Sequence, residues 1–223
     1  MLVPDLDNQV FTTWVERIEA ELFELGASTL VGGTRARTVE REREILQRFL
    51  HSGVEGVIVV SGGHHAQERG PVEHYREITA AGVPLVLING VREDVDAAFL
   101  STDDEHAMRL TLTHLQELGH RRIGLAVGDE HTWPVREKLT VFEEAAAAFP
   151  PEGDWATSFT DFSYAGGYEA ARDLVSRGVT AIVCGSDVMA AGALEAIRSL
   201  GLTVPPSDIS VVGYDDVFWA ALT

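Results

Sequence analysis

The chain has 223 residues, with 35 acidic against 17 basic side chains and a formal net charge of −18. An acidic chain repels the phosphate backbone, so we do not expect it to bind DNA by itself. Its one cysteine, Cys184, excludes a disulfide framework, and no segment resembles a membrane span or a signal peptide. We therefore expect a cytoplasmic protein, although a secreted protein that has lost its signal peptide would begin in the same way.

Short, unbroken apolar runs recur along the chain, and such runs are typical of strands buried on both faces of a parallel sheet. In chain order they cover residues 2–3, 28–31, 57–60, 85–88, 123–127, 181–184 and 209–212, with a further strand expected near Ser158. Residues 98–102 have the pattern of a short extended crossing. The runs therefore predict two similar series of strands, one on each side of this crossing.

Amphipathic helical patterns separate the runs, as where Trp14, Ile18 and Leu22 form one apolar stripe. Many patterns end at a glycine, which readily adopts the left-handed conformation of a helix end. These glycines are Gly26, Gly82, Gly119, Gly178 and Gly201. The order of strand, helix and strand predicts right-handed crossovers and an α/β fold of two similar lobes, each a parallel sheet flanked by helices. We place the lobes at residues 1–101 and 102–223, with the segment after about residue 214 heading back to the first lobe.

Polar residues and a few aromatic ones follow the expected strands, at the carboxyl ends where open parallel sheets bind their ligands. They are Asp5, Ser61, Asn89, Asp103, Asp104, Asp129, Asp161, Phe162, Ser186, Asp187, Tyr214, Asp215 and Asp216. Carboxylates and amides suit the hydroxyl groups of a sugar, and aromatic rings suit its C–H face. Helix capping is the alternative role of such residues, above all for Asp103 and Ser186.

Five motifs carry a more specific signal than the periodicity. They are V-P-D at 3–5 with Phe11, D-D-E-H-A-M-R-L at 103–110 with H-L at 114–115 and L-G-H-R-R-I-G at 118–124, F-S-Y-A-G-G-Y at 162–168, S-D-V-M-A-A-G at 186–192, and D-I-S-V-V-G-Y-D-D at 208–216. In order and spacing they resemble the effector-binding part of bacterial transcription regulators of the lactose/galactose repressor (LacI/GalR) family. The resemblance covers almost the whole chain, and the L-G-H-R-R-I string best separates it from periplasmic sugar-binding proteins.

The resemblance implies a type I periplasmic-binding-protein-like fold with a ligand cleft between the lobes. Arg136 is similar to an effector-contacting arginine of the family, although a surface arginine beside Glu137 is the alternative. Asp215 corresponds to the first aspartate of the family's Gly-aromatic-Asp-Asp motif. Further ligand contacts are implied at Asp5, Phe11, Asp103, Phe162 and Ser186.

Several positions depart from the family pattern. Ser186 stands where many relatives have asparagine, and Ala107 and Val141 replace common glycines. Pro134-Val135 precedes Arg136 where Ser-Ala is usual. These departures do not change the expected fold, but they make the identity of the ligand less predictable, so the resemblance does not imply a simple hexose.

The resemblance also implies the function and the partners. We expect a sensor without catalytic activity, cofactor or metal that binds a small effector, a sugar or sugar derivative. Operator DNA would be bound only through a head domain missing here, and the family's C-terminal end is also unmatched; a homodimer is implied, and no membrane contact. The alternatives are a free solute-binding protein for a sugar and an enzyme on the same scaffold, although no nucleophile–base pair is evident. The spacing of His64, His65 and His74 disfavours a metal site.

Overall fold

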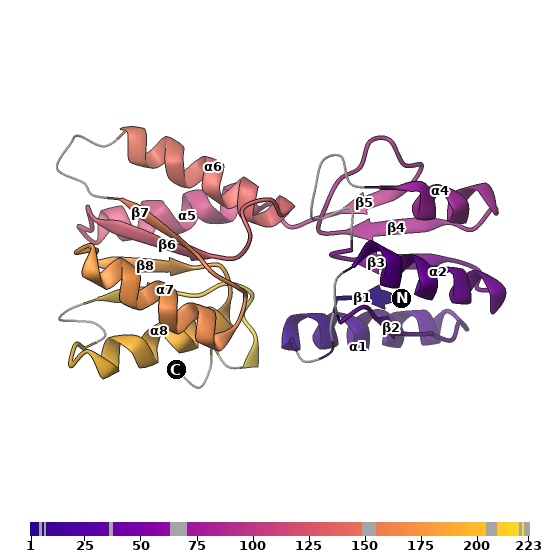
Figure 1. Ribbon diagram of the computed structural model, residues 1–223, viewed down its shortest axis with the longest axis horizontal. Coiled ribbons are helices and arrows are strands. Elements are labelled where there is room, and N and C mark those ends of the chain that lie inside the picture. The colour runs from indigo at the N-terminus through magenta and orange to yellow at the C-terminus, as the bar shows by residue number, and fades with distance from the viewer. Residues whose placement is uncertain are drawn as a thin grey trace. The chain divides into compact units, whose positions relative to one another are not determined.

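In the computed structural model the chain forms two compact units, Met1–Thr102 and Asp103–Thr223. The structure describes residues 1–4, 6, 8–35, 38–62, 71–148, 155–203, 209–218 and 220. Each unit is a parallel sheet with helices on both faces (Figure 1). Among the described residues, no helix is long and apolar enough to cross a membrane.

Unit 1 is built on a five-stranded sheet of order β2-β1-β3-β4-β5, in which every neighbouring pair is parallel. Its strands are β1 (Leu2–Val3), β2 (Gly32–Gly33), β3 (Val57–Val60), β4 (Leu85–Ile88) and β5 (Ala98–Leu100). Helix α1 (Gln9–Glu24) packs on one face, and α2 (Val39–His51) and α4 (Glu73–Ala80) pack on the other. The apolar residues of these helices and strands form two clusters, one on each face of the sheet.

The position of β2 corrects the sequence prediction, which placed this strand at residues 28–31. The strand pairs at Gly32–Gly33 instead, and Leu30 is exposed. A Cβ at Gly32 would lie 2.6 Å from the Ile45 side chain, so only glycine lets α2 pack this closely on the edge strand. A strand made of two glycines carries no apolar signal, which is why the pattern pointed to the residues before it.

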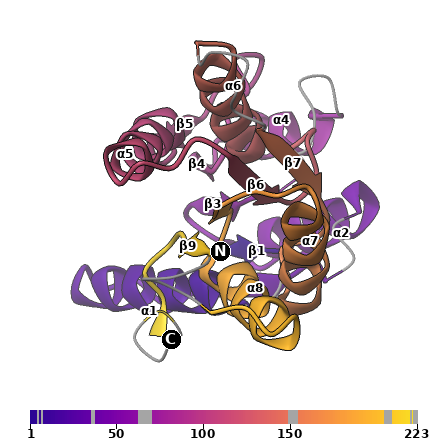
Figure 2. The ribbon, with the colours of Figure 1, turned by 90° about the vertical axis from the view of Figure 1, so that its left-hand side faces the viewer.

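Unit 2 is built on a four-stranded parallel sheet of order β7-β6-β8-β9. Its strands are β6 (Ile123–Val127), β7 (Ala156–Phe159), β8 (Ala181–Cys184) and β9 (Ser210–Val212). Helices α5 (Asp104–Glu117) and α6 (Trp133–Ala148) cover one face, and α7 (Tyr164–Ser176) and α8 (Asp187–Ser199) cover the other (Figures 1 and 2). The central strands β6 and β8 are buried along their whole length, as their unbroken apolar runs predict.

Local signals set where the helices begin and end. The side chains of Asn8, Ser163 and Ser186 accept hydrogen bonds from backbone N–H groups in the first turns of α1, α7 and α8. The five glycines expected at helix ends all have positive φ, between +73° and +91°. The predicted alternation of strands and glycine-terminated helices is therefore confirmed.

The strand order creates a switch point in each sheet. From β6 the chain passes to β7 on one side and then crosses to β8 on the other, and β1, β2 and β3 repeat this path in unit 1. In sheets of this order the loops leaving the two central strands turn away from each other, and ligands generally bind at this point, beyond the carboxyl ends of the strands. In unit 2 this places the expected binding edge beyond Val127 and Cys184.

His120, in the L-G-H-R-R-I motif, lies at the opposite edge of the unit 2 sheet. Its Nδ1 is 2.9 Å from the Thr180 hydroxyl and its Nε2 is 2.9 Å from the Ser210 hydroxyl, next to the first residues of β8 and β9. Burial lowers the pKa of His120, which favours the neutral ring. The motif thus holds strands together at the amino edge, away from the expected ligand.

Candidate functional site

The ring of Phe162 lies at the switch point of unit 2. It follows β7 and packs against the glycines that end the two central strands: a Cβ at Gly128 would lie 2.4 Å from the ring, and one at Gly185 would lie 2.9 Å from it. Phe162 also contacts both apolar clusters of the unit and is half-buried. The two glycines therefore make room for an aromatic surface at the carboxyl ends of β6 and β8.

A buried group of three polar side chains lies on the α5–α6 face of this unit. The Asp104 Oδ1 atom accepts hydrogen bonds from the Lys138 ammonium and, at 2.6 Å, from the Tyr214 hydroxyl. The Lys138 Nζ atom also lies 3.9 Å from the centre of the Tyr214 ring. Asp104 and Lys138 are almost inaccessible to solvent, and within the described chain the Asp104 Oδ2 atom is buried without a hydrogen-bond partner. That oxygen can accept a hydrogen bond from a donor group.

Asp215 follows Tyr214 in the loop after β9. Desolvation raises the pKa of its carboxyl to about 7; Lys138 lowers that pKa, and the like charges of Asp187 and Asp104 raise it. The residue as a whole is exposed, whereas its carboxyl is largely surrounded by protein, which is what raises the pKa. Its backbone has φ +101° and that of Asp216 has φ +54°, which non-glycine residues rarely adopt.

Asp187 fixes this strained loop. Its Oδ2 atom accepts a 2.8 Å hydrogen bond from the Val217 N–H, and its own N–H donates to the Tyr214 carbonyl at 2.8 Å. A Cβ at Gly213 would lie 2.2 Å from the Asp187 Oδ1 atom, so glycine is required there. Burial raises the pKa of Asp187. The side chain of Asp187 thus ties the start of α8 to the loop that carries Asp215.

Unit 1 has its own polar edge. Ser61 and Asn89 directly follow β3 and β4 with positive φ values of 45° and 64°, and the Asn89 amide donates to the Ser61 hydroxyl at 3.2 Å. Behind them, buried Glu42 accepts from the Tyr75 hydroxyl and lies 2.9 Å from His74 Nε2. Ser61 and Asn89, which the sequence placed after these strands, therefore lie at the carboxyl edge of the unit 1 sheet.

The residues expected at the site have different surroundings. Phe11 is buried beside Trp14, with ring centroids 6.1 Å apart, in the cluster that includes the last residues of β1, β3 and β4. Asp103 and Ser186 both cap helices, accepting from the N–H groups of His106 at 2.9 Å and Met189 at 3.4 Å. Asp5 lies outside the described residues.

Arg136 is exposed in the first turn of α6, beside Glu137. Burial and the charges of Glu105 and Asp104 raise the pKa of Glu137, whereas Arg136 lowers it. The surroundings of Arg136 are those of the surface arginine considered as the alternative, and its contact with a ligand stays a prediction. Unit 2 thus brings together Phe162, Ser186 and Asp215 at the ends of its strands.

Sequence reasoning missed Lys138, which pairs with Asp104 and lies against the Tyr214 ring. One signal could have identified it. Val135, Lys138 and Val141 are spaced by three residues and all three are buried, so a charged residue stands within an apolar helix stripe. Such a buried charge requires a partner, and Asp104 provides it.

The histidines weighed as metal ligands do not form a site in the described chain. His74 pairs with Glu42, and His64 and His65 lie outside the described residues. Within the part that the structure describes, no group of three or more histidine, cysteine, aspartate or glutamate residues could hold a metal ion.

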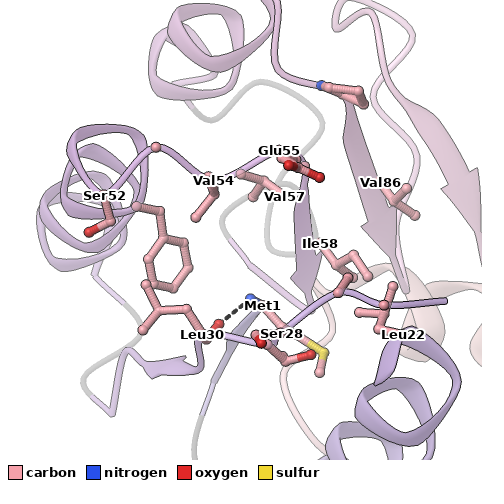
Figure 3. Close-up of a pocket in the computed structure, with 17 residues that line it drawn as sticks. Met1, Leu22, Ser28, Leu30, Ser52, Val54, Glu55, Val57, Ile58 and Val86 are labelled. Carbon is pink, nitrogen blue, oxygen red and sulfur yellow. Dashed lines mark hydrogen bonds between the residues drawn. The ribbon is translucent and has the colours of Figure 1, made fainter. Parts of the chain in front are cut away.

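A separate cavity of about 600 Å³ opens in unit 1 at the amino ends of the strands (Figure 3). Its wall includes Met1, Leu30, Val54 and Ile58, together with Glu55, from the loops and strands around β1 and β3. This is the opposite edge of the sheet from Ser61 and Asn89. It provides a rival location against which the carboxyl-edge site can be tested.

Two parallel sheets with helices on both faces define a protein of the α/β class, with polar groups at the switch points of its sheets. The profile of the periplasmic binding protein-like domain family matches residues 112–223, half of the chain. The chain belongs to this family.

The chain is also similar to curated transcription regulators. It is 39% identical over 227 residues to an uncharacterized HTH-type transcriptional regulator of Streptomyces limosus, covering 100% of this chain and 64% of that protein. It is 38% identical to the HTH-type transcriptional regulator MalR of Streptomyces coelicolor, covering 97% of this chain and 63% of MalR. The resemblance to LacI/GalR regulators is thereby confirmed, although the chain spans less than two thirds of these relatives.

Among solved structures, the chain is similar to the transcriptional regulator CelR in its complex with cellobiose. The two share 27% sequence identity with a TM-score of 0.80, over 98% of this chain and 68% of CelR. This likeness supports the fold class expected from the sequence.

Proposed function

We propose that this chain is the effector-binding part of a LacI/GalR-type transcription regulator and that it binds a small polyhydroxylated ligand at the carboxyl edge of its strands. The observation that carries the proposal is the arrangement in unit 2, where the Phe162 ring and the Asp215 carboxyl follow strands of one sheet. An aromatic face and carboxylate acceptors are the groups with which proteins hold a sugar. The relative CelR, whose structure contains cellobiose, supports the same ligand class.

Each contact has a definite chemical role in this proposal. Asp215 accepts hydrogen bonds from ligand hydroxyls, and Phe162 packs on the C–H face of a ring. Arg136 donates from its planar guanidinium, which requires its side chain to turn towards the ligand from the start of α6. Asp5, Phe11, Asp103 and Ser186 complete the proposed set, the last two in addition to capping their helices.

The effector acts as a signal and not as a substrate, so we propose no catalytic step and no cofactor. In the whole protein a separate head binds operator DNA, and two copies form a symmetric dimer. The HTH-type names of the similar regulators favour this function over that of a free solute-binding protein.

A thermal-shift screen of mono- and disaccharides tests the proposal. A ligand that binds only the folded state adds about 2.7 kcal/mol of stability at a hundredfold excess over its dissociation constant. Arg136→Ala and Asp215→Ala should abolish the shift. Glu143→Ala, an exposed residue of α6 away from the site, is the matched control and should retain it. If both site variants bind the hit as well as the parent chain does, the site assignment is wrong.

A further inference from the structure

A second buried polar group lies in unit 1, between α2 and α4. Glu42 is in the first turn of α2, and His74 and Tyr75 are in the first turn of α4. The Glu42 Oε1 atom accepts a hydrogen bond from the Tyr75 hydroxyl and lies 2.9 Å from His74 Nε2. The side chains of Glu42 and His74 are only 4% and 2% exposed, and Tyr75 is fully buried. We call these three residues the Glu42 cluster.

Stability alone does not explain the Glu42 cluster. A carboxyl group that leaves water destabilises the fold unless hydrogen bonds replace its hydration, and glutamate is therefore rarely buried. The amino ends of α2 and α4 favour a negative charge beside them, which offsets part of this cost. Apolar side chains of similar volume often fill such a space with equal or greater stability. A buried glutamate at this position therefore needs a reason other than stability.

The bend after β3, formed by Ser61 and Gly62, lies directly on the Glu42 cluster. A Cβ at Gly62 would lie 2.8 Å from Glu42 Oε2 and 2.8 Å from the Tyr75 hydroxyl oxygen, so the backbone of Gly62 packs on both side chains. Ser61 has φ +45°, which non-glycine residues rarely adopt. Such a conformation persists where the surrounding structure determines it. The cluster is the surface against which this strained bend is held.

The same bend carries the polar edge of unit 1. The Ser61 N–H donates to the Ile88 carbonyl at 2.9 Å, and the Ser61 hydroxyl accepts from the Asn89 amide at 3.2 Å. The Asn89 N–H in turn donates to the Leu100 carbonyl at 2.9 Å. A displacement of Ser61 would therefore also displace the side chain of Asn89, and with it the polar groups at the carboxyl edge.

We propose that Glu42, His74 and Tyr75 are positioning residues. Their hydrogen bonds fix the bend after β3, and through it the side chains of Ser61 and Asn89, in the shape that the ligand site uses. The inference rests on the proposed function, because it concerns the unit 1 part of the same carboxyl edge. The three residues act through the bend and not by contact with the ligand. A binding site keeps its geometry when the side chains behind it are themselves locked by hydrogen bonds.

Amide hydrogen exchange of the ligand-free full chain tests whether the cluster holds the bend. Tyr75→Phe removes a hydrogen-bond donor from the cluster and keeps the ring. We expect exchange at the Ser61 and Asn89 amides to become at least about fivefold faster, because the bend opens locally. The Val57 amide, which donates to the Pro84 carbonyl at the other end of the same ladder, should exchange as in the parent chain.

Glu77→Gln is the matched control. Glu77 forms an exposed ion pair with Arg43 between the same two helices, α2 and α4. Its loss should leave the exchange of Ser61 and Asn89 unchanged, and the affinity for a sugar as well.

Calorimetric titration with ribose, maltose and cellobiose separates positioning from packing. A triple variant, Glu42→Met with His74→Leu and Tyr75→Phe, replaces the cluster by apolar groups and should keep or raise the urea midpoint of the parent chain. For a sugar that the parent binds, we expect the triple variant and Tyr75→Phe to bind at least about threefold more weakly, because the bend loses its support. If the triple variant does not fold, Tyr75→Phe carries the test.

The outcomes separate the inference from the function on which it rests. Parent affinity in Tyr75→Phe, or unchanged exchange at Ser61 and Asn89 in that variant, overturns the inference while the sugar-binding function stands. An equal loss of affinity in Glu77→Gln also overturns it. Failure of the parent chain to bind any of the three sugars counts against the proposed function instead, and the exchange rates in Tyr75→Phe then decide alone whether the cluster holds the bend.

Discussion

Replacing Lys138 with methionine tests whether the buried ion pair organises the unit 2 site. Methionine keeps most of the side-chain volume but leaves the Asp104 carboxylate buried, with the Tyr214 hydroxyl as its remaining donor among the described residues. Removing one partner of a buried pair typically costs 3–5 kcal/mol. Because Tyr214 remains as a donor, we expect a loss at the lower end, about 3 kcal/mol.

A second substitution distinguishes the ion pair from simple packing. Asp104→Asn in the Lys138→Met chain removes the stranded charge, so the double variant should be at least about 1 kcal/mol more stable than Lys138→Met alone. Arg136→Met, an exposed position two residues earlier on α6, is the control and should change stability by about 0.5 kcal/mol or less.

Urea unfolding followed by tryptophan fluorescence measures these differences. Trp155 packs against Phe142 with ring centroids 4.9 Å apart and reports on unit 2. A Trp14→Phe background removes the one tryptophan of residues 1–102. A loss below about 1 kcal/mol for Lys138→Met, or a double variant no more stable than it, would refute the reasoning.

Because the pKa of Asp215 is about 7, its carboxylate form grows as pH rises; affinity for a neutral sugar should therefore increase up to about tenfold from pH 6 to pH 8 in calorimetry, and Asp215→Asn should flatten this dependence. Gly128→Ala places a Cβ 2.4 Å from the Phe162 ring, so it should lower the free energy of unfolding in urea by about 1–3 kcal/mol and lower the affinity for the sugar. A variant that keeps both the parent stability and the parent affinity would contradict the proposed role of the ring. With a net charge of −18, the chain should show no micromolar binding to duplex DNA in a low-salt mobility-shift titration.

The architecture could be predicted because its signals are local. Apolar runs at residues 57–60, 85–88, 123–127 and 181–184 became strands, since a strand buried on both faces needs an unbroken apolar sequence. The sequence prediction gave the wrong residues for the edge strand β2, because glycine has little strand propensity of its own. Gly32 is required there by the close approach of α2. Gly32 and Gly33 pair with Leu2 and Val3 of β1, about 30 residues earlier in the chain, and no local sequence pattern reveals this pairing.

The site was only partly predictable, for a physical reason. Asp215 and Phe162 follow strands and could be found from that position alone. The pairing of Lys138 with Asp104 joins residues 34 apart, and the anchoring of the β9 loop by Asp187 joins residues 30 apart. Such tertiary contacts leave at most an indirect trace in sequence, which here was a lysine on an apolar helix stripe.

Amide chemical-shift mapping of the isotope-labelled chain can locate a bound sugar directly. We expect the largest shifts at the carboxyl edges of the strands: at Gly128, Gly185 and Asp215 in unit 2, and at Ser61 and Asn89 in unit 1. Shifts confined to the amino edge, around His120 or the unit 1 cavity of Figure 3, would contradict the proposed site.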